Sequence, residues 1–160
     1  MRKILSITLL LAVVLTGFTS CDNNKKVDKP VNFYYLNAPE NLGQSTLGAE
    51  VRSSAGLEDD LPGLLQMYLK GPQTDDLQSP FPKRITVKDA KIRGITVHIT
   101  VSSELVQLAG LDMTLATACL TMTALEYTGM QRVSITATDA KGSILYANSL
   151  TQADILLLDD

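Results

Sequence analysis

The sequence has no tryptophan and a single histidine, and aromatic residues make up 5% of its 160 residues. This scarcity argues against an aromatic platform on which sugars or bases could stack. Because His98 is the only histidine and no cysteine lies near it, a zinc site cannot be completed. A glycine-rich phosphate loop, a GxSxG elbow and an SxxK motif are also missing. These absences predict a protein that is not an enzyme and has no metal or cofactor.

Cysteine is almost as scarce, with only Cys21 and Cys119. A positive start at Arg2 and Lys3 leads into an apolar run over residues 4–15, and small residues at 16–20 lead directly to Cys21. Charged, apolar and small-residue regions in this order are typical of a secretory signal. A signal that ends on a cysteine indicates a bacterial lipoprotein, in which Cys21 becomes the first mature residue and carries a diacylglyceryl group.

Two other interpretations of this segment are an ordinary secreted protein with an unpaired thiol and a retained membrane span. The apolar run is about a dozen residues long, shorter than the roughly 20 that cross a bilayer. We therefore expect residues 1–20 to be a signal peptide and Cys21 to be the lipidation site. The mature protein would then be lipid-anchored on the extracytoplasmic face of the cell membrane.

The mature chain would be acidic and large enough for one domain. Removal of residues 1–20 leaves 140 residues, and loss of Arg2 and Lys3 takes the net charge from −3 to −5. An acidic surface argues against nucleic acid as a partner. With Cys21 acylated, Cys119 has no partner for an intramolecular disulfide. Residues 21–31 comprise the lipidated cysteine and a polar, flexible tether, and residues 32–160 form the domain.

Alternating and helical hydrophobic patterns divide the domain into eight elements. Strands are expected at residues 31–36, 47–52, 84–88, 91–102, around 133–137 and at 143–146, with a last short strand in the tail from residue 154 to 160 as a further expectation. A helix opens at residues 58–60 and ends at Gly71, with an apolar face formed by Leu61, Leu64, Leu65, Tyr68 and Leu69. Residues 73–83 are expected to form a loop.

A second helix is expected over residues 111–127 and ends at Gly129. Its predicted apolar side comprises Leu111, Leu115, Ala118, Met122 and Leu125. The order β-β-α-β-β-α-β-β predicts an α+β fold with one mixed sheet and two helices packed on a single face.

Two isolated side chains, His98 and Cys119, are of types that often take part in catalysis or metal binding. His98 lies on the face of its strand opposite Val97 and Ile99, so a solvent-facing residue is favoured over a general base or metal ligand. Cys119 lies between Ala118 and Leu120 and is favoured as a core residue over a nucleophile.

A basic cluster stands out in the otherwise acidic chain. Its members are Lys83, Arg84, Lys88, Lys91 and Arg93. They form a candidate patch for a partner protein or an anionic wall polymer. The alternative, which we favour, is a charged strand edge that prevents pairing with other strands.

Four segments in sequence order carry a resemblance to a known family. Residues 64–72 (LLQMYLKGP) resemble the helix and Gly-Pro stop of the GerMN domain of sporulation and spore germination, and residues 79–82 (SPFP) resemble its next loop. Residues 97–105 (VHITVSSEL) are similar to its strand in which a hydrophobic alternation ends in Ser-x-Glu-Leu. Residues 120–125 (LTMTAL), with Gly129 and the strand around Val133, are similar to its last helix and strand. Lys83 and Arg84, where glycine is common, and Ala124, where leucine is common, depart from the pattern.

The resemblance implies an envelope lipoprotein of sporulation or germination that has no recognised active site. The leading hypothesis is a membrane-anchored, non-catalytic module that assembles with envelope proteins. The alternative is a lipoprotein that binds peptidoglycan or another wall glycan through the basic cluster.

Overall fold

The computed structural model describes residues 29–39 and 45–156. The first half contains strands β1 (Pro30–Asn37) and β2 (Leu47–Ser53), helix α2 (Leu61–Tyr68) and the two-residue strand β3 (Leu77–Gln78). The second half contains β4 (Val87–Arg93), β5 (Thr96–Ser102), the 3-10 helix η3 (Ser103–Gln107), α3 (Leu111–Thr128), β6 (Arg132–Thr138), β7 (Ile144–Leu150) and α4 (Gln152–Leu156). The predicted α+β class is confirmed.

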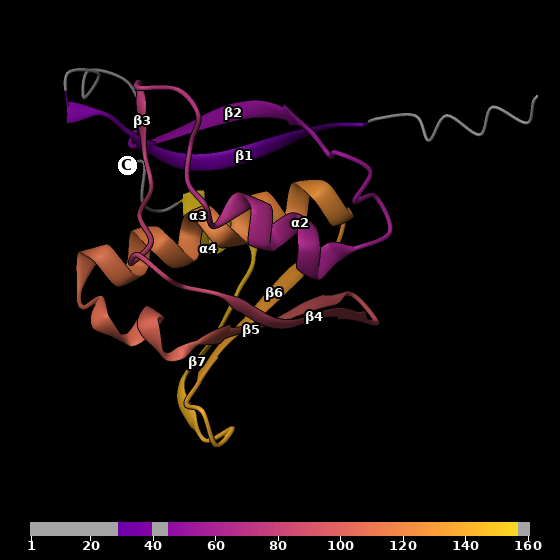
Figure 1. The fold of residues 1–160 in the computed structure, drawn as a ribbon, viewed down its shortest axis with the longest axis vertical. Coiled ribbons are helices and arrows are strands. Elements are labelled where there is room, and N and C mark those ends of the chain that lie inside the picture. Colours follow the sequence, from indigo (N-terminus) through magenta and orange to yellow (C-terminus); the bar gives the residue numbers. More distant parts are fainter. Residues whose placement is uncertain (1–28, 40–44, 157–160) are drawn as a thin grey trace, which may run out of the picture.

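The strands form two sheets rather than the single mixed sheet expected from the sequence. One sheet has the order β2-β1-β3, and the other has the order β4-β5-β6-β7 with a parallel pair at β5 and β6. Helix α3 contacts β1 on one side and β5 and β6 on the other. The two long helices therefore lie in a layer between the sheets (Figure 1).

This sandwich explains why the apolar side predicted for α3 is wrong in part. Leu111 is exposed and Leu115 is half-buried, whereas residues 116–121 are all buried. A helix covered on both sides needs small or apolar residues around most of its circumference, not one stripe. Gly129, at φ 67°, ends the helix as predicted, with its N–H bonded to the Leu125 carbonyl at 2.8 Å.

Helix α2 begins where its acidic residues indicated. Asp60 caps the N-terminus and its carboxylate accepts from the Gly63 N–H at 3.0 Å. Leu64, Leu65 and Tyr68 are fully buried, as the predicted apolar face requires. The Tyr68 ring contacts Phe33, Tyr35 and Phe81 with centroid separations of 5.0 to 5.4 Å. This aromatic cluster joins the helix layer to β1.

Several predicted boundaries are corrected. The loop expected at residues 73–83 contains the short strand β3, and the strand expected at 143–146 continues to Leu150 as β7. The break between β4 and β5 lies at Gly94, so Lys91 to Arg93 belong to the first of the two strands. Only the last residues of the predicted strand at 84–88 are in β4, and Arg84 has φ 72°. The tail forms helix α4 instead of a strand as far as residue 156, and residues 157–160 lie outside the described part of the chain.

Candidate interaction surfaces

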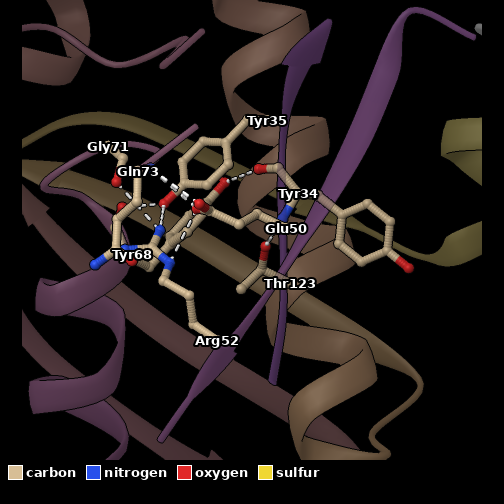
Figure 2. Close-up of polar contacts among 8 residues, drawn as sticks. All are labelled: Tyr34, Tyr35, Glu50, Arg52, Tyr68, Gly71, Gln73 and Thr123. Carbon is tan, nitrogen blue, oxygen red and sulfur yellow. Dashed lines mark hydrogen bonds and ion pairs between the residues drawn. The ribbon is translucent and has the colours of Figure 1, made fainter. Parts of the chain in front are cut away.

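A buried polar network holds the three-stranded sheet against the end of α2 (Figure 2). Glu50 and Arg52, on the inner side of β2, form an ion pair with Nε to Oε2 at 3.0 Å and side chains only 8% and 9% exposed. The Arg52 guanidinium also donates to the Tyr35 hydroxyl and, at 3.1 Å, to the Gly71 carbonyl. The Glu50 carboxylate accepts from the Gln73 N–H at 3.0 Å. Both charges are therefore used inside the fold.

Two tyrosines extend this network to the open edge of β1. The Tyr35 hydroxyl donates to the Tyr68 carbonyl at 2.8 Å, and the Tyr68 hydroxyl donates to the Tyr34 carbonyl at 2.6 Å. Burial raises the pKa of both hydroxyls, so they remain protonated donors.

The Tyr34 N–H donates to Thr123 Oγ1 on α3 at 3.0 Å (Figure 2). Because β3 pairs only with Leu36 and Asn37, side chains of the helix layer take the place of a neighbouring strand along the rest of β1.

A groove of about 980 Å³ runs beside β2 and the segment at residues 73–77. Glu50, Arg52 and Gln73 are in its wall, and each already has a partner inside the fold. The groove is thus a boundary of the buried network. The side chains of Glu50 and Arg52 are not displayed to a ligand there, whereas Asp76, which also lines the groove, is exposed.

The four-stranded sheet is different, because one of its faces is covered by the helix layer and the other carries polar side chains. Val97, Ile99 and Val101 point inward and are buried. The opposite positions of β5 are Thr96, His98 and Thr100, and cross-strand register adds Ser134 and Thr136 of β6. His98 is half-buried on this polar face, between Lys91 and Ser134 in the register.

The predicted basic cluster does not form one patch. Register places Lys91 and Arg93 of β4 on the polar face of the sheet, with Arg132 of β6 on the other side of Thr96 from Arg93. Lys91 forms an ion pair with Asp89. Lys88 donates to the Thr138 and Asp139 carbonyls at 2.8 and 2.7 Å, and Lys83 and Arg84 precede the strand. Arg132 is the member of the polar-face group that the sequence did not indicate.

Strand β4 is an edge of its sheet, as the strand-edge interpretation of these cations requires. Charged side chains on an edge strand discourage pairing with another chain. The opposite edge, β7, has no charged residue in Ile144–Leu150 and leaves Ile144 and Leu145 exposed.

Cys119, the acidic residues and Cys21 are the remaining candidates for chemistry. Cys119 is fully buried, and burial raises the pKa of its thiol to about 12, which leaves it a poor nucleophile. Within residues 29–39 and 45–156, no group of three or more His, Cys, Asp or Glu side chains could hold a metal ion. Cys21 lies outside the described residues. In the part of the chain that is described, no helix has the length and apolar character needed to span a bilayer.

Comparisons with known proteins identify the family. The family model Germane, described as sporulation and spore germination, matches residues 32–141. The chain therefore belongs to the Germane family, and the GerMN resemblance is confirmed.

Solved structures show the same fold at low sequence identity. The first GerMN domain of the sporulation protein GerM from Bacillus subtilis has 16% identity and a TM-score of 0.59, with 79% of this chain and 99% of that chain covered. The tandem GerMN domains of the same protein give 18% identity and a TM-score of 0.51, over 84% of this chain and 49% of that chain.

A proposed lipoprotein from Clostridium perfringens gives 15% identity and a TM-score of 0.50, over 83% of this chain and 93% of that chain. No curated protein sequence matches the chain. Together these likenesses establish the family and the fold.

Proposed function

We propose that this protein is a lipid-anchored, non-catalytic interaction domain on the extracytoplasmic face of the cell membrane, acting in envelope assembly during sporulation or germination. The observation that carries the proposal is the Germane match over residues 32–141 in a chain whose Cys21 follows a lipoprotein-type signal. A neighbouring fold in a proposed lipoprotein supports the same setting.

The polar face of the four-stranded sheet is the part of the domain best suited to bind an envelope protein. It carries small hydroxyl side chains at Thr96, Thr100, Ser134 and Thr136, and it is the face of the sheet turned away from the helix layer. The charged side chains of the other sheet are already bonded within the buried network. The polar face therefore offers partly exposed hydroxyl groups on a sheet of four paired strands.

In-cell photocrosslinking tests this assignment. A photoreactive residue at Thr136, on the polar face, should give a defined adduct with one envelope protein during sporulation or germination. The same residue at Ser53, exposed on β2, is the matched control and should give less of that adduct. Repeated absence of any adduct from Thr136 through growth, sporulation and germination would contradict the proposal.

Binding of peptidoglycan or another wall glycan is the second candidate. It is favoured by the arrangement of Arg93 and Arg132 on either side of Thr96, where two cations and a hydroxyl share one face. Salt-sensitive co-sedimentation of the protein with purified cell wall, lost in Arg93→Gln but kept in Lys88→Gln, would support it. Lys88→Gln is the control because its ammonium group is bonded within the fold. Failure to sediment with wall would exclude this candidate.

A further inference from the structure

The end of the domain at which the described chain begins also carries an exposed apolar turn. Lys29 and Pro30 line a hollow of about 400 Å³, and Ile92 of β4 lines the same hollow. The start of β1 and the β4–β5 turn lie on the same side of the molecule (Figure 1). We call this end, with Lys29, Pro30 and residues 92–95, the tether pole.

The β4–β5 turn displays two isoleucines. Arg93 pairs with Thr96, so the connection is only Gly94 and Ile95, and Gly94 adopts φ 59°. The side chains of Ile92 and Ile95 are 48% and 56% exposed. The Ile95 carbonyl accepts from the N–H groups of Gln131 and Arg132 at 3.1 and 3.3 Å, which ties the turn to the start of β6. The exposed apolar side chains therefore stand on a fixed backbone.

The stretch of sequence from this pole to residue 21 is short. Lys29 is the eighth residue after Cys21, and a fully extended chain covers about 3.5 Å per residue, so this stretch spans at most about 28 Å. An acyl group on Cys21 would thus keep the tether pole within roughly one domain diameter of the bilayer. At that effective concentration even a weak surface contact becomes well populated.

We propose that the β4–β5 turn inserts Ile92 and Ile95 into the interface of the bilayer that holds the lipid anchor, with Arg93 extended toward the headgroups. This inference depends on the lipid anchor of the proposed function. Transfer of apolar side chains from water to the acyl boundary is favourable, because it lowers the free energy of the system. An arginine beside them can keep its charged end in the headgroup layer.

Charge does not drive this contact. Glu58, Asp59 and Glu126 line the same hollow as Lys29, so acidic residues lie beside the cations of the tether pole, Lys29 and Arg93. The contact is therefore expected with zwitterionic as well as anionic vesicles, and it should change little with salt.

The docked orientation directs the other end of the sheet away from the membrane. Thr96 pairs with Arg132 at the tether pole, while Ile144 pairs with Thr138 at the far end. Thr138 is six residues further along the strand than Arg132, which corresponds to about 20 Å. Ile144 is 67% exposed, which makes it a matched control for Ile95.

The test uses the acylated chain bound to phosphatidylcholine vesicles, with an environment-sensitive fluorophore on Ile95→Cys or on Ile144→Cys in a Cys119→Ala background. The probe at position 95 should shift its emission to shorter wavelength and be quenched by spin-labelled lipids. The probe at position 144 should do neither. Equal, water-like emission from both positions on a chain that floats with the vesicles would overturn the inference and leave the anchor intact.

Failure of the acylated chain to float with vesicles would instead overturn the anchor and, with it, this inference. A label-free measurement covers disturbance by the fluorophore. Hydrogen exchange of residues 92–96 should be slower in the anchored chain than in Cys21→Ala mixed with the same vesicles. Ile95→Ser should lower the docked-to-free ratio by at least about tenfold, whereas Ile144→Ser should not change it. Equal exchange in the anchored and unanchored chains would contradict docking.

Discussion

The two sheets of this domain differ in whether their charged side chains are buried or exposed. In the three-stranded sheet, Glu50 and Arg52 point inward and are almost fully buried as an ion pair. In the four-stranded sheet, Asp89 and Lys91 form a pair whose side chains are both 47% exposed. An acidic and a basic residue at positions i and i+2 of a strand therefore form a buried ion pair in one sheet and a solvent-exposed ion pair in the other. Burial decides between these roles, so only the second sheet offers its charged groups to a partner.

Removal of Arg52 should produce the largest effect on this comparison. Arg52→Ala leaves the Glu50 carboxylate buried without its cation, and it also removes a guanidinium that lies 4.5 Å from the centroid of the Phe33 ring. Breaking a buried pair in this way costs about 3–5 kcal/mol of unfolding free energy. Urea denaturation followed by circular dichroism measures the loss. A cost below that of an ordinary surface substitution would show that the network does not support the fold.

Two threonines on α3 provide a sharper test of buried polar groups. Thr123→Val removes the acceptor of the Tyr34 N–H and should cost about 1–3 kcal/mol. Thr121 is also fully buried, but its hydroxyl has no hydrogen-bond partner among the described residues. Thr121→Val should therefore be neutral or stabilising in the same urea titration. Equal losses in the two variants would mean that helix packing, and not the bond to β1, sets the cost.

The core thiol predicts a dependence of stability on pH. An unfolded cysteine loses its proton near pH 8.5, whereas burial raises the pKa of Cys119 in the fold to about 12. Between these values the unfolded chain binds fewer protons than the folded chain, so the free energy of unfolding falls as pH rises. Burial raises the pKa of Tyr34 in the same direction, to about 12. Urea midpoints at pH 8 and 10.5 should show this decline, and a smaller decline in Cys119→Ala; identical pH dependence in the two proteins would contradict it.

The exposed pair of the four-stranded sheet should give the smallest effect. Lys91→Ala removes the partner of Asp89, and exposed pairs of this kind contribute little to stability because solvent screens them. The urea midpoint should shift only slightly in low salt and not at all in high salt. A loss comparable to that of Arg52→Ala would erase the distinction between the two sheets.

Much of the fold could be predicted from local patterns. The aromatic-rich run at residues 31–36 predicts β1, because aromatic residues favour strands. The i, i+3, i+4 spacing of Leu61, Leu64 and Leu65 predicts α2, because it reflects one buried helix face. The break at Gly94 cannot be predicted in this way, because the alternation of apolar residues hardly changes across a two-residue turn. The second sheet was missed because sequence order does not say whether a helix is covered on one side or on both.

The candidate surfaces were harder to predict, since they depend on long-range register. Arg132 joins Arg93 only through the parallel pairing of β5 and β6. The spacing of Glu50 and Arg52 was a signal for a shared strand face, but nothing local shows that this face is the buried one. Lipidation of Cys21 and the function of the basic residues remain predictions of the sequence.

The most direct test of the account is mass spectrometry of the N-terminal peptide of the protein extracted from cell membranes. We predict a chain that starts at Cys21 and carries the mass of a diacylglyceryl group on its sulfur. A mature chain that begins at another residue, or that has an unmodified Cys21, would contradict the account.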